Sequence, residues 1–169
     1  MAKVDSKVQT CLWFNHNAEE AAKFYVSLIP NSRIDAIHRS PADTPSGPAG
    51  MVLLVDFTLG GHKLQGLNGG PNFKFNEAIS LVIECEDQAE VDRLWDAFSK
   101  GGGEPGPCGW VKDRFGLSWQ VTPRELNEML DSPDKEGARR AMEAMLEMGK
   151  IDIAACRRAF KGETVGTSA

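Results

Sequence analysis

Apolar and polar positions along the chain repeat one design twice: an apolar strand, a short polar break and an amphipathic helix. The first copy covers residues 10–25 and the second covers residues 80–95. The copies align at a constant separation of 70 residues, so that Asn17 aligns with Asp87. A repeated strand-helix unit predicts a fold built by pairing two similar modules, and a space between such modules is a natural site for a small molecule.

The first module is predicted to run in the order β-α-β-β-β. Its helix begins at a capping-box-like sequence, Asn17 to Glu20, and carries an apolar stripe on one side. Gly60 and Gly61 predict a two-residue hairpin. The segment 40–50 is rich in proline, glycine and serine and predicts a loop, which we expect to form a mobile rim. The expected strands cover residues 8–14, 33–38, 51–59 and 62–67.

The second module and a helical extension follow a linker at residues 68–76. A second capping-box-like start, at residues 87–90, opens a helix that the glycines at 101–103 bring to an end. A further capping box with proline in the first turn, at residues 122–125, predicts the first helix of the extension. The other expected elements are strands at 78–85, 108–112 and 117–121, a weak or distorted strand near 104–107, and helices at 133–149 and 152–160.

These elements divide the chain into four parts. The expected parts are a first βαβββ module at residues 1–68, a second module at 77–122, a C-terminal helical extension at 123–160 and a tail at 161–169. The tail is small and polar, so we expect it to be frayed.

Composition narrows the functional class. The 169 residues carry a formal net charge of −5 and are 41% hydrophobic, which suits a globular protein with a substantial core and argues against a nucleic-acid-binding surface. No apolar run approaches the ~18 residues of a membrane span, and residues 1–6 lack the apolar core of a signal peptide. We therefore expect a cytoplasmic protein with no nucleic-acid partner and no membrane partner.

The cysteines and histidines show no spacing typical of a metal or catalytic site. Cys11 and Cys85 lie in apolar, strand-like runs and are expected to be buried, reduced thiols. No two of the cysteines form the CxxC spacing of structural zinc sites. His16, His38 and His62 are scattered, and each is expected on the surface or in a turn. His16 is the preferred candidate if any histidine is catalytic, so the catalytic residues stay unassigned.

Longer motifs point to a known family. They occupy residues 12–14, 18–25, 30–32, 108–120 and 150–154, and the long fourth motif is specific. On these motifs the chain resembles the vicinal oxygen chelate (glyoxalase/bleomycin-resistance) superfamily, and within it the PhnB-like group often labelled demethylubiquinone methyltransferase. The resemblance implies an α+β fold in which paired βαβββ modules form a curved mixed sheet around a cup, with C-terminal helices and, in many members, a homodimer.

The same resemblance suggests which residues line the cup. Metal-using relatives place ligands on the first and last strands of each module, and these positions fall on Thr10, Gln65, Ser80 and Gln120. Two hydroxyls and two amides are neutral, weak ligands for a divalent ion. We therefore expect no metal and no cofactor, and a cup in which these four side chains orient an uncharged or weakly polar organic ligand by hydrogen bonds.

Apolar side chains should complete the wall of this cup. Phe14 and Leu67 share the strand phase assigned to Thr10 and Gln65 and are expected to contact the ligand. Trp110 is the most plausible tryptophan in such a contact. Trp13 and Trp119 are opposite in phase to the polar positions, so both are expected in the core.

Three functions stay open at this stage. The leading hypothesis is a small-molecule-binding protein of the vicinal oxygen chelate fold that lacks the usual metal ligands, with its reaction unknown. The second is a divalent-metal-dependent enzyme of the glyoxalase or dioxygenase type. The third is the methyltransferase named by the group's label. The usual methyl-donor site needs a glycine-rich turn between a strand and a helix, which neither glycine cluster of the chain provides.

We predict that the chain forms a homodimer. Half-barrel modules leave strand edges with unpaired backbone groups, and such edges need a partner. Light scattering at micromolar concentration should give twice the mass of one chain. A particle with the mass of a single chain would contradict the prediction.

Overall fold

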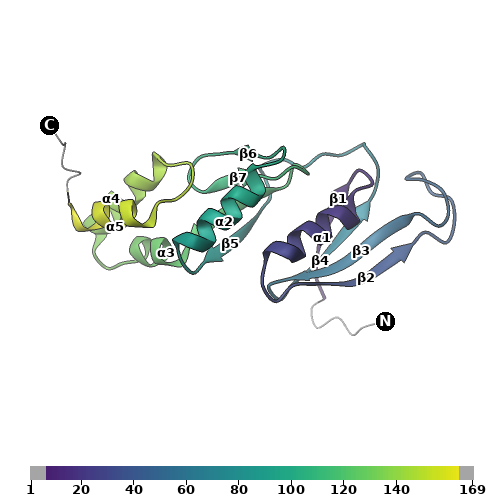
Figure 1. The fold of residues 1–169 in the computed structure, drawn as a ribbon, viewed down its shortest axis with the longest axis horizontal. Coiled ribbons are helices and arrows are strands. Elements are labelled where there is room, and N and C mark those ends of the chain that lie inside the picture. Colours follow the sequence, from purple (N-terminus) through teal and green to yellow (C-terminus); the bar gives the residue numbers. More distant parts are fainter. Residues whose placement is uncertain (1–6, 164–169) are drawn as a thin grey trace. The chain divides into compact units, whose positions relative to one another are not determined.

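A computed structural model describes residues 7–163 of the chain. The chain divides into two compact units, Met1–Phe75 and Asn76–Ala169, and each is described by itself (Figure 1). Each unit contains a four-stranded mixed sheet and a helix packed on it. The α+β class and the repeated βαβββ order are therefore confirmed.

The first unit follows the expected order of elements. Its sheet has the strand order β1-β4-β3-β2, in which β1 runs parallel to β4 and the other pairs are antiparallel. Residues 40–50 form the expected loop, and Gly60 and Gly61 form the expected hairpin turn. The elements are β1 Thr10–Phe14, α1 Ala18–Leu28, β2 Arg33–Arg39, β3 Val52–Leu59 and β4 His62–Asn68.

Small side chains let α1 lie close to its sheet. Ala18, Ala21 and Ala22 are fully buried, and Tyr25 extends the same stripe. A Cβ atom at Gly66 would lie only 3.1 Å from the Cβ of Ala18, so glycine at this strand position permits the close approach. The stripe packs on a sheet face made of large apolar residues, namely Leu12, Phe14, Val55, Phe57 and Leu64.

The amino end of α1 is capped from the sheet. The predicted capping box is wrong, because the Asn17 side chain makes no capping hydrogen bond. Asn68, at the end of β4, accepts from the backbone N–H of Ala18 at 2.9 Å and donates to the carbonyl of Val52 at 2.9 Å. This buried amide therefore joins the helix start to two strands.

The second unit repeats the design, but its second and third strands are much shorter than those of the first unit. Its sheet has the order β5-β8-β7-β6, again with the first and last strands parallel. The second capping box is confirmed, since Asp87 accepts from the N–H of Glu90 and Glu90 accepts from the N–H of Glu86. The elements are β5 Ser80–Cys85, α2 Gln88–Ser99, β6 Glu104–Pro105, β7 Trp110–Lys112 and β8 Ser118–Pro123.

A buried carboxylate organises the turn between β7 and β8. Asp113 is 2% exposed, and one of its oxygens accepts from the N–H groups of Phe115 and Leu117. Its other oxygen accepts from the indole N–H of Trp119 at 2.8 Å. The Trp119 ring stacks on Phe98 with centroids 4.5 Å apart, which confirms its predicted place in the core.

Three helices follow β8: α3 Arg124–Leu130, α4 Lys135–Leu146 and α5 Ile153–Lys161. The predicted capping box at residues 122–125 is wrong, because Thr122 and Pro123 belong to β8 and α3 starts without a side-chain cap. Asp134 and Asp152 cap the other two helices. The helices share a small core of their own, formed by Leu126, Met129, Ala141, Ile151 and Cys156. Of the tail expected to fray, Lys161 closes α5, and residues 164–169 lie outside the described residues.

Gln88 joins this extension to the second module. Its amide donates to the carbonyl of Ile151 at 2.9 Å, and its amide oxygen accepts from the N–H of Ile153 at 2.9 Å. The loop before β7 is held in a similar way, because the N–H groups of Cys108 and Gly109 donate to the carbonyls of Met148 and Gly149.

We predict that Asp113→Asn destabilises the second unit by about 2 kcal/mol. An amide is neutral and has one oxygen, so at least one of the three N–H donors loses its acceptor and the others keep only a neutral one. Urea unfolding followed by tryptophan fluorescence measures the loss. Asp131→Asn, at an exposed carboxylate, is the control and should change the free energy of unfolding by less than ~0.5 kcal/mol. Equal effects of the two variants would show that Asp113 does not organise the turn.

Candidate functional site

Each sheet has one face covered by the helix of its unit and an opposite face, called here the open face. Strand alternation divides the side chains between the two faces. In the first unit the open face includes Cys11, Trp13, Gln65, Leu67, Asp56 and Leu54. In the second unit it includes Ser80, Val82, Ser118, Gln120, Trp110 and Lys112.

The predicted strand phase is wrong for β1. Phe14 is 2% exposed and contacts the ring of Phe75 in the helix-covered core, so it does not form a wall of the open face. Thr10 shares the phase of Phe14 and pairs with buried Leu64. Trp13, expected in the core, lies on the open face instead, where its indole N–H donates to the carbonyl of Gly70 at 2.9 Å.

A one-residue difference in the strand-helix link explains this error. β1 ends at Phe14 and α1 begins at Ala18, whereas β5 ends at Cys85 and α2 begins at Gln88. The longer link of the first unit contains His16 with a positive φ of 65°. The helices therefore correspond at a separation of 70 residues and the strands at 71. Ser80 consequently corresponds to Gln9 rather than to Thr10.

The sequence contained a signal of this shift. At a separation of 70 residues, apolar Phe14 aligns with charged Glu84, although both positions were assigned to equivalent strands. A single residue of slip moves every side chain of a strand to the other face. Matching the apolar phases of the two strands, rather than the helix starts, would have placed Cys11 beside Gln65, as in the structure.

Gln65 and Leu67 lie on the open face of the first unit, as their strand phase predicted. The Gln65 amide donates to Asp56 Oδ1 at 2.9 Å. Asp56 Oδ2 lies 2.7 Å from His38 Nε2, so one carboxylate bridges an amide and an imidazole. Sequence reasoning missed the hydrogen-bonded row of Gln65, Asp56 and His38, because His38 and Asp56 are 18 residues apart and share no motif.

The open face of the second unit contains a hollow. Its volume is about 440 Å³, and Trp110 lines it together with Ser118, which is 2% exposed. Beside it, the Gln120 amide donates to Ser80 Oγ at 2.9 Å and connects β8 to β5. The remaining lining residues are Glu77, Glu104, Pro105, Gly106, Pro107, Val111 and Lys112.

Lys112 is the cation of this hollow, and two carboxylates neutralise it. Its Nζ lies 2.7 Å from Glu77 and 3.7 Å from Glu104. The hydrogen bond to Glu77 raises the pKa of Lys112 and lowers the pKa of Glu77. One cation and two anions give the polar end of the hollow a net negative charge. Sequence reasoning had not identified these three residues.

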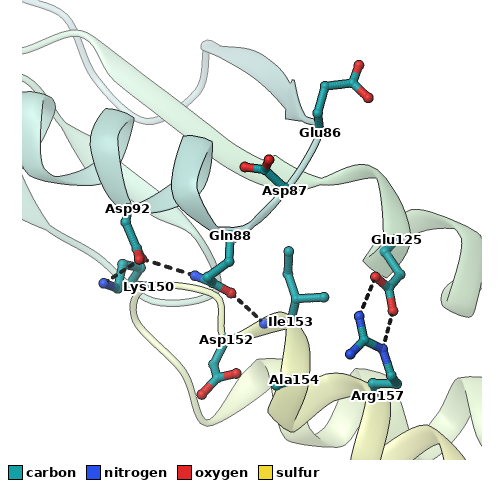
Figure 2. A pocket seen from close by; sticks show the side chains of 10 residues that line it. All are labelled: Glu86, Asp87, Gln88, Asp92, Glu125, Lys150, Asp152, Ile153, Ala154 and Arg157. Atoms are coloured by element: carbon teal, nitrogen blue, oxygen red, sulfur yellow. Dashed lines mark hydrogen bonds and ion pairs between the residues drawn. The ribbon is translucent and has the colours of Figure 1, made fainter.

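A second hollow, of about 420 Å³, lies where α2, α3 and α5 meet (Figure 2). Both of its basic side chains are paired: Lys150 with Asp92 at 2.7 Å, and Arg157 with Glu125 through two contacts at 2.6 and 2.7 Å. These partners lower the pKa of Asp92 and of Glu125. Figure 2 shows Gln88 between Asp92 and Ile153, so the hollow coincides with the junction of module and extension.

The residues at the ligand positions that the resemblance implied do not fit a divalent ion. Gln65, Ser80 and Gln120 are neutral, and both amides donate to neighbouring side chains. Among residues 7–163, no three His, Cys, Asp or Glu side chains are grouped as a metal site would require. The same part of the chain contains no helix with the length and apolar character of a membrane span.

Comparisons with known proteins agree with this fold. The family model described as 3-demethylubiquinone-9 3-methyltransferase matches residues 6–122. The PhnB protein from Bacillus cereus is 32% identical, with a TM-score of 0.61, and the match covers 70% of this chain and 99% of that protein. A protein from Pseudomonas aeruginosa, at 21% identity and a TM-score of 0.58 over 70% and 98% of the two chains, shares the fold. No curated protein matches. These findings confirm the resemblance read from the motifs.

We predict that iodoacetamide labels Cys11 of the folded chain and leaves Cys85 unlabelled. The expectation that Cys11 is buried is wrong, because Cys11 is exposed on the open face; desolvation still raises the pKa of its thiol and slows the reaction. Cys85 was correctly expected to be buried, and burial raises the pKa of its thiol to about 12. Peptide mapping of native and denatured samples measures both. A native chain that reacts at Cys85 before Cys11 would contradict the assigned faces.

Proposed function

We propose that this chain, which belongs to the 3-demethylubiquinone-9 3-methyltransferase family, binds an uncharged or weakly polar small organic molecule on the open face of its second unit without a divalent metal. The observation that carries the proposal is the hollow beside the Ser80–Gln120 pair. Its volume of about 440 Å³ lies in the range of small-molecule sites.

The walls of the hollow favour a flat, largely apolar ligand. Trp110 offers an aromatic face, and Pro105, Pro107 and Val111 add rigid apolar surface. Ring contacts of this kind suit an aromatic or quinone-like body. The family description names a demethylubiquinone, and a ring of that class has a suitable size and polarity.

Charge argues against an anionic ligand. The Lys112 ammonium is already paired with Glu77 and approached by Glu104, so an incoming carboxylate would meet a negative balance. A carbonyl, ether or neutral hydroxyl meets no such repulsion. It could instead use the amide oxygen or the second amide N–H of Gln120, because one N–H of that amide is engaged by Ser80.

The first unit and a second copy of the chain complete the proposal. Gln65 and Leu67 present an amide and an apolar side chain on the open face of the first unit, and we propose that they contact a ligand that binds on that face. We also propose that the chain works as a homodimer, in keeping with its superfamily. Phe14 and Thr10 are not part of the proposed site, because they share the phase of the helix-covered core.

The chemistry of the open-face residues separates this proposal from metal-dependent and methyl-transfer reactions. A glyoxalase- or dioxygenase-type reaction needs a held cation, for which neutral amides are poor ligands. Methyl transfer needs a donor site, and neither strand-helix link, at residues 15–17 and 86–87, contains the glycines of the usual one. Elemental analysis and titration with S-adenosylmethionine test these two alternatives directly.

We predict that Trp110→Ala and Gln120→Leu each weaken ligand binding about tenfold. The first removes the aromatic wall, and the second removes a polar partner while nearly preserving volume. Native mass spectrometry identifies small molecules that copurify with the full chain, and titration with a fully substituted quinone such as decylubiquinone gives the affinity. Val82→Ala, at an exposed open-face position outside the hollow, is the matched control and should bind normally.

Two results would contradict the proposal. Unchanged affinity in both Trp110→Ala and Gln120→Leu would place the ligand elsewhere. About one equivalent of zinc, nickel, manganese or iron per chain, lost in Gln120→Leu, would instead favour the metal-dependent alternative.

A further inference from the structure

We propose that the open face of the first unit is a proton-transfer site, in which His38 is a general base and Asp56 is its positioning residue. Asp56 Oδ2 lies 2.7 Å from His38 Nε2, and Asp56 Oδ1 accepts from the Gln65 amide at 2.9 Å. The three side chains come from β2, β3 and β4, so adjacent strands of one sheet fix their geometry.

The hydrogen bonds determine which ring nitrogen is the base. An ionised carboxylate can only accept, so Nε2 of His38 must donate to Asp56. In the neutral imidazole the lone pair is then on Nδ1, which is the atom that can take a proton. Gln65 holds the second carboxylate oxygen, so the carboxylate cannot rotate away without losing a hydrogen bond. A histidine oriented by a carboxylate in this way is the arrangement of a general base.

The base is accessible and lies beside an apolar surface. The His38 side chain is 52% exposed, so a ligand can reach its ring. In the sheet register His38 is paired with Leu54, Leu54 with Leu67, and Leu67 with Trp13. The Trp13 ring is fixed by its hydrogen bond to the Gly70 carbonyl. An apolar row therefore crosses the sheet from the base to an anchored indole.

The loop at residues 40–50 borders the Trp13 end of this row. Ser46 Oγ donates to the carbonyl of Gly69 at 3.2 Å, and a Cβ at Gly69 would lie 2.3 Å from the Trp13 ring. Loop, linker and indole thus meet at one end, while His38 and Asp56 lie toward the other strands. The face can accept a ligand with an apolar body and one acidic C–H bond.

The chemical class of the substrate follows from the position of a base beside an apolar surface. The substrate is an uncharged organic molecule with a C–H bond made acidic by a neighbouring carbonyl. The proton moves to His38 Nδ1, the electron pair of the C–H bond is delocalised onto the substrate oxygen, and the imidazolium that forms is stabilised by the Asp56 carboxylate. Returning the proton to another carbon gives an isomerised product. Neither step needs an oxidant, a reductant or a second reactant.

This inference goes beyond ligand binding in the second unit. All of its residues belong to Met1–Phe75, and none lines the hollow that contains Trp110. Loss of binding in Trp110→Ala and loss of proton transfer in His38→Ala are therefore separate outcomes.

The probe for the base is 5-nitrobenzisoxazole, an uncharged aromatic molecule whose C–H bond is broken by general bases. Proton removal breaks its N–O bond and releases a coloured nitrophenolate, so absorbance reports the rate. The full chain should react faster than an equal concentration of 4-methylimidazole. In His38→Ala the part of the rate that exceeds the 4-methylimidazole rate should fall about tenfold or more. His62→Ala, at an exposed histidine in a hairpin, is the matched control and should keep the wild-type rate.

Asp56 needs a readout that a merely structural role would not change. Nitrogen-15 NMR of the wild-type chain should show His38 protonated at Nε2, and Asp56→Asn should shift the ring toward a mixture of tautomers while circular dichroism stays unchanged. The proposal is overturned if the chain is no faster than 4-methylimidazole, if His38→Ala keeps the full rate, or if His38 of the wild type is protonated at Nδ1.

Discussion

The two-residue repeat of the β-strand controls which chemistry this molecule presents. A helix covers one face of each sheet, so every strand divides its residues between a packed core and an open surface. Adding or removing one residue between a strand and the helix that follows it changes which strand residues face that helix. In the first unit the longer link with His16 leaves Cys11 and Trp13, rather than Thr10 and Phe14, on the open side.

Much of the fold could be predicted because it depends on local periodicity. The repeated strand-helix order, the hairpin at Gly60 and Gly61 and the place of Trp119 in the core all follow from the spacing of apolar residues and from turn chemistry. For the candidate site residues, the face of the sheet on which each one lies could be predicted only in part. Gln65, Gln120 and Trp110 lie on open faces as expected, since their strands were assigned the correct phase.

The features of the fold and the site that could not be predicted depend on polar contacts between residues far apart in the sequence. Asn68 caps a helix that begins 50 residues earlier, and the sequence around Ala18 does not indicate this partner. His38 reaches Asp56 because β2 and β3 pair antiparallel with His38 beside Leu54, which makes His38 and Asp56 diagonal neighbours on one face of the sheet. Contacts of this kind are set by how strands align in space, and a pattern of apolar and polar positions contains no information about side-chain reach.

The helical extension affects the cooperativity of folding. Backbone groups at Met148 and Gly149 accept from Cys108 and Gly109, the residues that directly follow the proline-containing wall of the hollow. Gln88 adds two further bonds in the same region. The matched family region ends at residue 122, so these contacts tie a shared module to residues outside that region. We therefore expect the loop that lines the hollow and the extension to unfold together, so that a substitution in either one affects the stability of both.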